Sequence, residues 1–239
     1  PDWYRAVDAI SISAARLLRH DRLLALSKQL FALLAPADDA PSLAVPLFVT
    51  SSVRLSMQLF IAGQYDGAIP LLHKIEEIVA HAPAPHPPTM MAQVLAMRAN
   101  RAAVEWKLDI SRDLYEQSAE LLDQVGDIRG ACSQRLDAAL FCSDIADFSR
   151  MEQLLRKIVP VAESLGLLRL LGVARSALSI ALWRQGRAEE ALPLCQAALQ
   201  ELIVAGDSRQ QGVCRINIAR IQLTRGELDL AQQAATEAS

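Results

Sequence analysis

The feature that most constrains this chain is a helix-ending residue that recurs at a fixed interval. Two interleaved series share a spacing of 40 residues: Gly126, Gly166 and Gly206, and Ala146, Gly186 and Gly226. Glycine is favoured just after the last turn of a helix because it adopts the left-handed backbone conformation without a steric penalty. Two such positions in each period predict two helices per period.

Between these positions the apolar residues recur at intervals of three and four, as in segments 173–182 and 192–202. This spacing is typical of amphipathic helices that bury one face. Hydrophobic residues make up 52% of the chain, and most of them are Ala and Leu, which favour helices over strands. The sequence therefore predicts an all-α protein and excludes a disordered chain.

The segment GQYDGA, residues 63–68, resembles the tetratricopeptide pattern of a Gly, an aromatic residue two positions later and an Ala five positions later. SIALWRQGRAEEA, from Ser179, and NIARIQLTRGELDLA, from Asn217, carry a small residue seven positions before their Gly, as that family does. The resemblance covers most of the chain. It implies a TPR-like right-handed superhelical α-solenoid of antiparallel helix pairs.

We expect a single helical-repeat domain over residues 1–239, a fragment of a larger protein, with about six helix pairs. The expected pairs lie at about 2–35, 43–81, 88–125, 128–165, 168–205 and 208–239. In the third pair we expect Asp109 to replace the turn Gly and Leu114 to replace the Ala that packs after it. The unit is longer than the 34-residue tetratricopeptide repeat and closer to those of large bacterial regulators.

Several function classes are disfavoured by composition and motifs. A net charge of −3 lacks the basic surface that nucleic-acid binding needs, and no apolar run is long enough to span a membrane. We therefore expect a cytoplasmic protein. No phosphate-binding loop, nucleophile motif or zinc motif is present, so we expect neither catalysis nor a metal or other cofactor.

The cysteines and histidines are interpreted as structural and surface residues. A shift of 40 residues places Cys195 on Leu155 and Cys214 on Ala174, which predicts buried packing. The histidines at 73, 81 and 86 have no local set of partners that would hold a metal. The adjacent acids Glu76 and Glu77 are expected to face water.

In tetratricopeptide arrays the first helix of each pair lines a concave groove, so the resemblance implies a site for a protein or peptide there. Carried over one position at a time from each Gly, this partner-binding groove contains Met57, Phe60, Ile61, Ile180, Trp183, Arg184, Arg220, Leu223 and Thr224. Trp106 and Lys107 mirror Trp183 and Arg184 if Asp109 stands in for the turn Gly. A tryptophan beside a basic residue is typical of binding hot spots. The alternative is that both tryptophans pack against neighbouring helices.

A basic ladder forms a second candidate site. Its members are Arg98, Arg135, Arg175 and Arg215, which stacking would place in a row along successive first helices. Such a row can hold an acidic or phosphorylated peptide through bidentate hydrogen bonds. Alternatively, acids such as Asp137, Asp144 or Glu163 neutralise it within the stack.

The favoured function is a non-catalytic interaction or regulatory module that binds a peptide or partner domain along its groove. The alternative is a small-molecule-sensing domain of a bacterial transcriptional or signalling regulator, with a metabolite near Phe60 or Trp106. A homodimer through the last repeat also stays open, because Leu228, Leu230 and Ala231 are expected to be exposed at that end.

Overall fold

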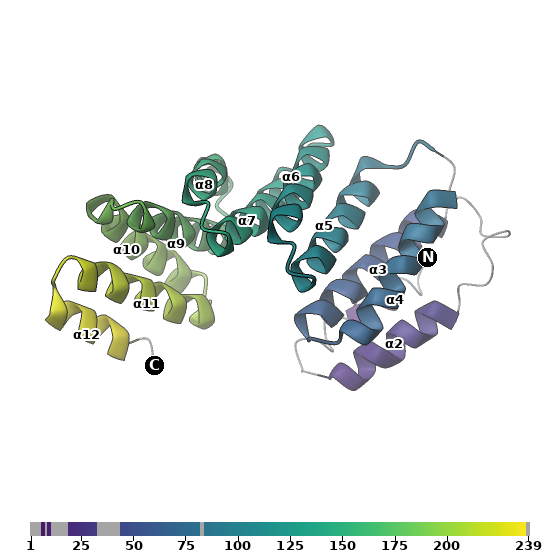
Figure 1. Ribbon diagram of the computed structural model, residues 1–239, viewed down its shortest axis with the longest axis horizontal. Coiled ribbons are helices and arrows are strands. Elements are labelled where there is room, and N and C mark those ends of the chain that lie inside the picture. The colour runs from purple at the N-terminus through teal and green to yellow at the C-terminus, as the bar shows by residue number, and fades with distance from the viewer. Residues whose placement is uncertain (1–5, 8, 11–18, 33–43, 82–83, 238–239) are drawn as a thin grey trace. The chain divides into compact units, whose positions relative to one another are not determined.

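The computed structural model describes residues 6–7, 9–10, 19–32, 44–81 and 84–237, and all regular elements in these ranges are helices (Figure 1). The helices are α2 (His20–Ala32), α3 (Ala44–Ile61), α4 (Tyr65–His81), α5 (Pro88–Val104), α6 (Leu108–Gln124), α7 (Ile128–Asp144), α8 (Phe148–Ser164), α9 (Leu168–Arg184), α10 (Ala188–Val204), α11 (Ser208–Thr224) and α12 (Leu228–Thr236). The prediction of an all-α fold is confirmed. Of the expected first pair, most of the first half lies outside the described residues.

Contacts between helices divide the chain into two compact units, residues 1–127 and 128–239, which are described separately. In unit 1, α3 packs on α4 and α5 packs on α6, while α2 contacts both α3 and α4. In unit 2 the pairs are α7 with α8, α9 with α10, and α11 with α12. The first helices of unit 2 also contact one another, α7 with α9 and α9 with α11. Unit 2 therefore has a continuous layer of first helices.

The turns between helices share one geometry, which explains the spacing in the sequence. From α5 to α11 each helix has 17 residues and is followed by a turn of three. The middle residue of the turn has a positive φ, for example 76° at Gly126 and 81° at Gly186. The next residue closes the turn, as where the Asp127 N–H donates to the Leu122 carbonyl at 2.9 Å. The prediction that these glycines end helices is confirmed.

The third pair differs from the expected register because Trp106, not Asp109, occupies the turn. Trp106 has a φ of 58°, and the Lys107 N–H donates to the Ala102 carbonyl at 2.9 Å, as in the other turns. Asp109 lies in the first turn of α6. Ser111, five residues after Trp106, is fully buried and takes the packing position that was assigned to Leu114. The prediction failed because a bulky residue seldom adopts a positive φ.

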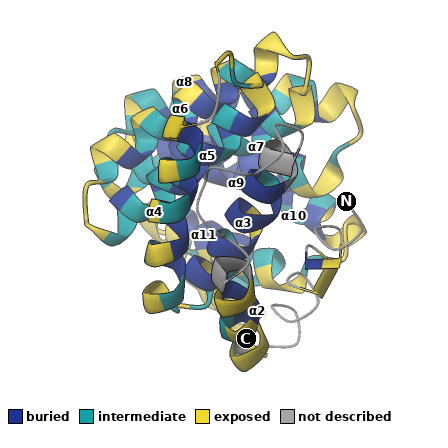
Figure 2. Cartoon of the chain, turned by 90° about the vertical axis from the view of Figure 1, so that its right-hand side faces the viewer, coloured by how far each residue is buried: buried dark blue, intermediate teal, exposed yellow. Residues whose placement is uncertain are grey.

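Small residues allow neighbouring helices to approach closely. Ala68, Ala131 and Ala191, each five residues after a turn glycine, are fully buried. At Gly172 in α9, an added Cβ would lie 2.7 Å from Leu202 Cγ of α10. Figure 2 shows that buried positions follow the sides along which helices pack, while many exposed positions gather at the turns. Core packing thus depends on small side chains at fixed places in the repeat.

The turn geometry predicts that Trp106→Gly stabilises the fold. Glycine adopts a positive φ without the penalty of about 1 kcal/mol that a side chain incurs, and the Trp106 side chain, 84% exposed, loses little packing. We expect the free energy of unfolding, measured by urea denaturation, to rise by about 1 kcal/mol. Ala146→Gly, at a φ of 60°, is the matched control and should act in the same direction. A loss of stability in the Trp106 variant alone would show that its side chain makes a stabilising contact.

Candidate functional site

The layer of first helices in unit 2 presents a row of side chains near the C-terminal ends of α7, α9 and α11. We call this surface the first-helix face, and it consists of Leu140, Asp144, Ile180, Trp183, Arg184, Arg220, Leu223 and Thr224. Leu140 is 43% exposed and Leu223 is 58% exposed, while Ile180 and Trp183 are half-buried. The repeat sets Leu140, Ile180 and Arg220 at equivalent positions. The face therefore combines apolar and charged groups on three neighbouring helices.

Trp183 links two successive helix pairs. Its Nε1–H donates to Thr224 Oγ1 at 2.9 Å, and the Thr224 hydroxyl donates to the Arg220 carbonyl at 3.0 Å. The indole is half-buried, so it packs toward α11 and still keeps part of its surface exposed. Trp183 therefore packs against a neighbouring helix, as one alternative predicted, and part of its ring stays accessible; its role in binding stays a prediction.

Arg184 lies beside this indole, and Arg220 lies on α11 one helical turn before Thr224. The Arg184 Cζ atom is 4.9 Å from the centroid of the Phe148 ring and 5.8 Å from that of Trp183. These distances are in the range of cation–π attraction. Neither arginine forms an ion pair with any residue that the structure describes. The first-helix face therefore carries two uncompensated positive charges.

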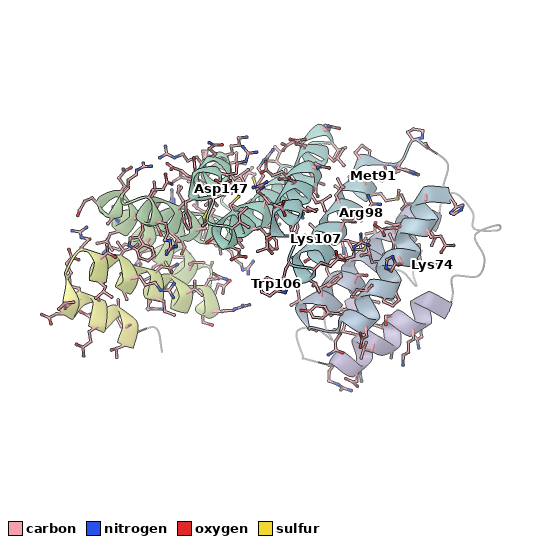
Figure 3. The ribbon with its side chains drawn as sticks, in the orientation of Figure 1. Lys74, Met91, Arg98, Trp106, Lys107 and Asp147 are labelled. Carbon is pink, nitrogen blue, oxygen red and sulfur yellow. The ribbon has the colours of Figure 1, made fainter. Side chains whose placement is uncertain are left out.

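The arginines of the ladder are engaged within the stack. Arg98 Nε donates to Glu76 Oε1 of α4 at 2.7 Å (Figure 3). Arg175 forms ion pairs with Glu163, at 2.8 Å, and with Glu201. The two remaining members also have interactions. Arg215 Nε lies 4.0 Å from Glu237 Oε2, and Arg135 interacts with another residue.

Of the acids proposed to neutralise this ladder, only Glu163 does so in the contacts described. Glu76 was expected to face water, and instead it bonds both Arg98 and Arg101. Glu201, which pairs with Arg175, is a second unpredicted partner. Both acids lie on second helices, more than 20 residues from their partners, and nothing in the local sequence pairs them with an arginine.

Unit 1 places the other candidate residues differently from the expected groove. Phe60 is buried in the core at 7% exposure, and Met57 packs against the same core and is half-buried. Ile61, by contrast, is 76% exposed at the end of α3. Trp106 projects from the α5–α6 turn, and Lys107 beside it pairs with Glu105 at 2.7 Å (Figure 3).

The shifted register of the third pair changes one equivalence. Trp183 lies three residues before its turn residue, Gly186, and the residue three before Trp106 is Ala103. Trp106 and Lys107 therefore do not mirror Trp183 and Arg184, as the sequence had indicated. They belong to the turn and to the start of α6 rather than to a first helix.

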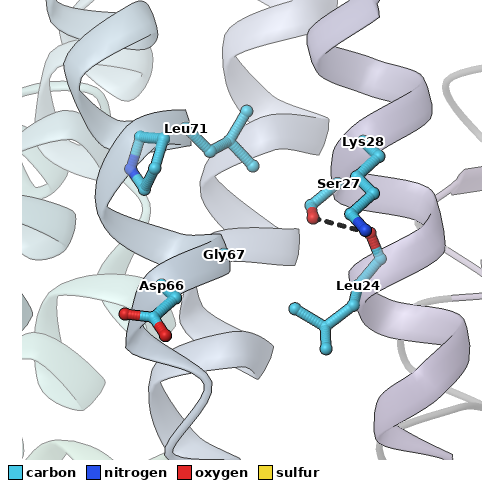
Figure 4. Close-up of a pocket in the computed structure, with 7 residues that line it drawn as sticks. Leu24, Ser27, Lys28, Asp66, Gly67 and Leu71 are labelled. Carbon is cyan, nitrogen blue, oxygen red and sulfur yellow. Dashed lines mark hydrogen bonds between the residues drawn. The ribbon is translucent and has the colours of Figure 1, made fainter.

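A cavity of about 470 Å³ lies between α2 and α4 in unit 1 (Figure 4). Its lining includes Leu24, Ser27 and Lys28 from α2, and Asp66, Gly67, Pro70 and Leu71 from α4. The Ser27 hydroxyl donates to the Leu24 carbonyl at 2.9 Å, so it is satisfied within α2. The cavity is mostly apolar, with one ammonium and one carboxylate among its lining groups. No sequence motif marks this place, because it depends on how α2 packs against α4.

The cysteines are buried, as predicted, and the Sγ atoms of Cys195 and Cys214 lie 3.5 Å apart. Among the described residues no three His, Cys, Asp or Glu side chains are placed to share a metal ion. No helix in the described ranges is long and apolar enough to cross a membrane.

At the last repeat Leu228 and Leu230 are exposed as expected, but Ala231 is buried against the array, which corrects that part of the expectation.

Asp137 on α7 is a carboxyl group in an unfavourable environment. Burial raises its pKa to about 7. Its equivalents in the next two repeats are Ala177 and Asn217, both buried and uncharged. The position is therefore one at which the fold disfavours a charge.

The comparisons with known proteins agree with this geometry. Residues 170–239 match the family model of the tetratricopeptide repeat. The comparison with curated protein sequences found no match. The crystal structure of BtubC from P. vanneervenii has a similar fold at 13% identity and a TM-score of 0.68, with 92% of this chain and 87% of that chain covered.

Two further structures of similar fold contain a second component. A Rap protein complexed with Competence and Sporulation Factor shares 14% identity at a TM-score of 0.69, covering 99% of this chain and 64% of that one. NprR in complex with its cognate peptide NprX shares 13% identity at a TM-score of 0.57, covering 98% and 66%. The chain spans less than two thirds of each of these proteins. Its fold is a tetratricopeptide-like array of helix pairs.

The environment of Asp137 predicts a stability that depends on pH. Its folded pKa of about 7 lies above the value near 4 of an unfolded chain, so the folded state loses stability as pH rises from 4 to 7. We expect Asp137→Asn to raise the free energy of unfolding at pH 8 by about 1 to 3 kcal/mol relative to the parent, because the side chain stays partly exposed. Urea denaturation should show this difference disappearing near pH 4. An equal difference at both pH values would contradict the raised pKa.

Proposed function

We propose that this chain is a non-catalytic interaction module whose first-helix face binds an extended segment of a partner protein or peptide. The observation that carries the proposal is the set of exposed apolar side chains on α7 and α11 and unpaired guanidiniums on α9 and α11, all near the C-terminal ends of three neighbouring helices. Tryptophan and arginine are the residue types most enriched among binding hot spots. A cytoplasmic role in bacterial signalling is part of the same proposal.

The contrast with the exposed side of α8 supports this assignment. The exposed positions in the middle of α8 are polar or charged, such as Gln153, Arg156 and Lys157. The first-helix face instead exposes Leu140 and Leu223. Helices α10 and α12 also expose apolar side chains, so the feature that favours the first-helix face is the presence of unpaired arginines beside them.

The structures of similar fold lend further support. One of them is a Rap protein with Competence and Sporulation Factor, and another is NprR with its cognate peptide. The NprR complex shows that a helix-pair array of similar fold can hold a peptide. For this chain, the proposal of peptide binding depends on the residues of its own first-helix face.

A second candidate function is the sensing of a small molecule in the cavity between α2 and α4. Its volume of about 470 Å³ is in the range of ligand pockets, and its apolar lining with Lys28 and Asp66 suits a small charged metabolite. This place differs from the expected one, near Phe60 or Trp106.

Thermal shift with a panel of metabolites tests the sensor. A ligand of the cavity should raise the melting temperature of the parent protein, and the rise should shrink in Lys28→Met if that ligand is an anion. Asp66→Asn is the matched variant on the other side of the cavity and should affect cations instead. If no metabolite in the panel raises the melting temperature, the sensor function is contradicted and the proposed interaction module is unaffected.

The proposed interaction predicts that Trp183→Ala weakens partner binding. Peptides selected from a random dodecapeptide library by the parent protein provide the probe, and loss of the indole should cost about 1 to 3 kcal/mol of binding free energy. Circular dichroism should show unchanged helicity, because only one hydrogen bond, to Thr224, is lost. Trp106→Ala, outside the first-helix face, should bind as the parent does. Unfolding of the Trp183 variant would instead make this residue part of the core.

A further inference from the structure

Two cysteines on neighbouring helix pairs form a thiol pair that the proposed interaction does not use. Cys195 lies on α10 and Cys214 on α11, and both side chains are fully buried. Their Sγ atoms are 3.5 Å apart, and Cys214 Sγ lies 3.2 Å from the Cys195 carbonyl oxygen. The helices belong to successive pairs, so the packing of one pair on the next brings the two sulfur atoms together.

The surroundings of the thiol pair favour a negative charge on one of its members. The hydrogen bond from the Cys214 thiol lowers the pKa of Cys195, and burial opposes this effect. The hydroxyls of Ser179 and Ser176, two buried residues of α9, lower it further. The same hydrogen bond and burial raise the pKa of Cys214. Because the thiolate is the nucleophilic form of cysteine, Cys195 is the member that reacts first.

The other two cysteines provide an internal reference. Cys132 and Cys142 are also free and buried, so all four thiols are shielded from solvent to a similar degree. Both lie on α7, ten residues apart, which corresponds to about 15 Å along a helix axis. They therefore cannot bond to each other, whereas the sulfur atoms of Cys195 and Cys214 are already in contact.

We propose that Cys195 and Cys214 form an oxidation site, at which a peroxide converts the two thiols into a disulfide bond that joins α10 to α11. The Cys195 thiolate attacks one oxygen of hydrogen peroxide, the O–O bond breaks and hydroxide leaves, which gives a sulfenic acid. The Cys214 sulfur then attacks the Cys195 sulfur, and the S–O bond breaks. The departing hydroxide takes the Cys214 proton and leaves as water. The thiols lose two electrons in total, and the peroxide is reduced to water.

The burial of the pair determines how the reaction proceeds and what it changes. Peroxide reaches the sulfur atoms during local opening of the contact between α10 and α11, because neither thiol is open to solvent in the closed array. A disulfide bond is about 2 Å long, so the sulfur atoms must approach by about 1.5 Å. The bond closes a loop of about 20 residues and thereby restricts the unfolded chain.

Peroxide treatment of the reduced 239-residue chain tests the proposal. After treatment, the chain is alkylated with N-ethylmaleimide in urea, digested with trypsin and analysed by mass spectrometry. Arg209 separates the two cysteines, so trypsin places them in different peptides, 188–209 and 210–215. We expect these peptides to be joined, with the loss of two hydrogen atoms, before Cys132 or Cys142 is oxidised. Recovery of the two peptides alkylated and unjoined, after Cys132 and Cys142 have reacted, would overturn the proposal.

Two single variants test the order of the reaction. Cys214→Ala removes the second thiol, and alanine fits there because the equivalent residue of α9, Ala174, is fully buried. In this variant peroxide should leave a sulfenic acid at Cys195, which dimedone traps. Cys195→Ala is the matched variant, and its Cys214 should take up little dimedone under the same conditions. Circular dichroism checks that both variants are folded. Equal dimedone labelling of the two variants would overturn the assignment of Cys195 as the reacting thiol.

The melting temperature tests whether the bond holds α10 to α11. Oxidation should raise it by about 5 °C or more in the parent protein, and should leave that of Cys214→Ala unchanged. If the disulfide forms and the parent melts at the same temperature or lower, the bond does not strengthen this contact, and that part of the proposal is overturned. None of these measurements depends on the first-helix face, so their failure would leave the proposed function unaffected.

Discussion

The left-handed residue at the middle of each three-residue turn is the constraint on which the other features depend. It lets the next N–H reach back to the helix it leaves, as Asp127 does to Leu122 at 2.9 Å, and so returns the chain antiparallel after 17 residues. Because the turns from α5 to α12 are alike, residues five positions after the turn residue, such as Ala131 and Ala191, pack at the same place in each repeat. Equivalent positions then align, and a face such as that around Trp183 can form.

Charge is used in two distinct ways in this array. The buried or half-buried arginines of the ladder, such as Arg98 and Arg175, hold successive helices together through Glu76, Glu163 and Glu201. These ion pairs are partly buried, so loss of one partner would leave the other charge partly desolvated and unpaired, and would lower stability. Arg184 and Arg220 have no acidic partner among the described residues, so the same residue type is paired in one row and unpaired in another.

The features that the sequence predicted are those that depend on residues close together in the chain. Turn glycines such as Gly166 carry their own signal, so the helix pairs and the fold class were predictable. Trp106 was missed as a turn residue because its conformation goes against its own preference, and it is fixed by the helices on either side. The partners of Arg98 and the cavity beside Gly67 depend on contacts between distant segments, which no local pattern encodes. The first-helix face was only partly predicted, since Phe60 proved to be core.

The equal length of all helices from α5 to α11 restricts which insertions and deletions this chain can accept during evolution. Loss or duplication of a 20-residue unit, which is one helix with its turn, would preserve the turns. It would, however, place first helices where second helices belong, and second where first belong, in all later repeats. Side chains that suit an exposed binding surface would then lie at packing positions, and packing side chains would lie at the exposed surface. Viable changes in length therefore come in steps of two helices, and genes for such arrays should grow by duplicating the double unit.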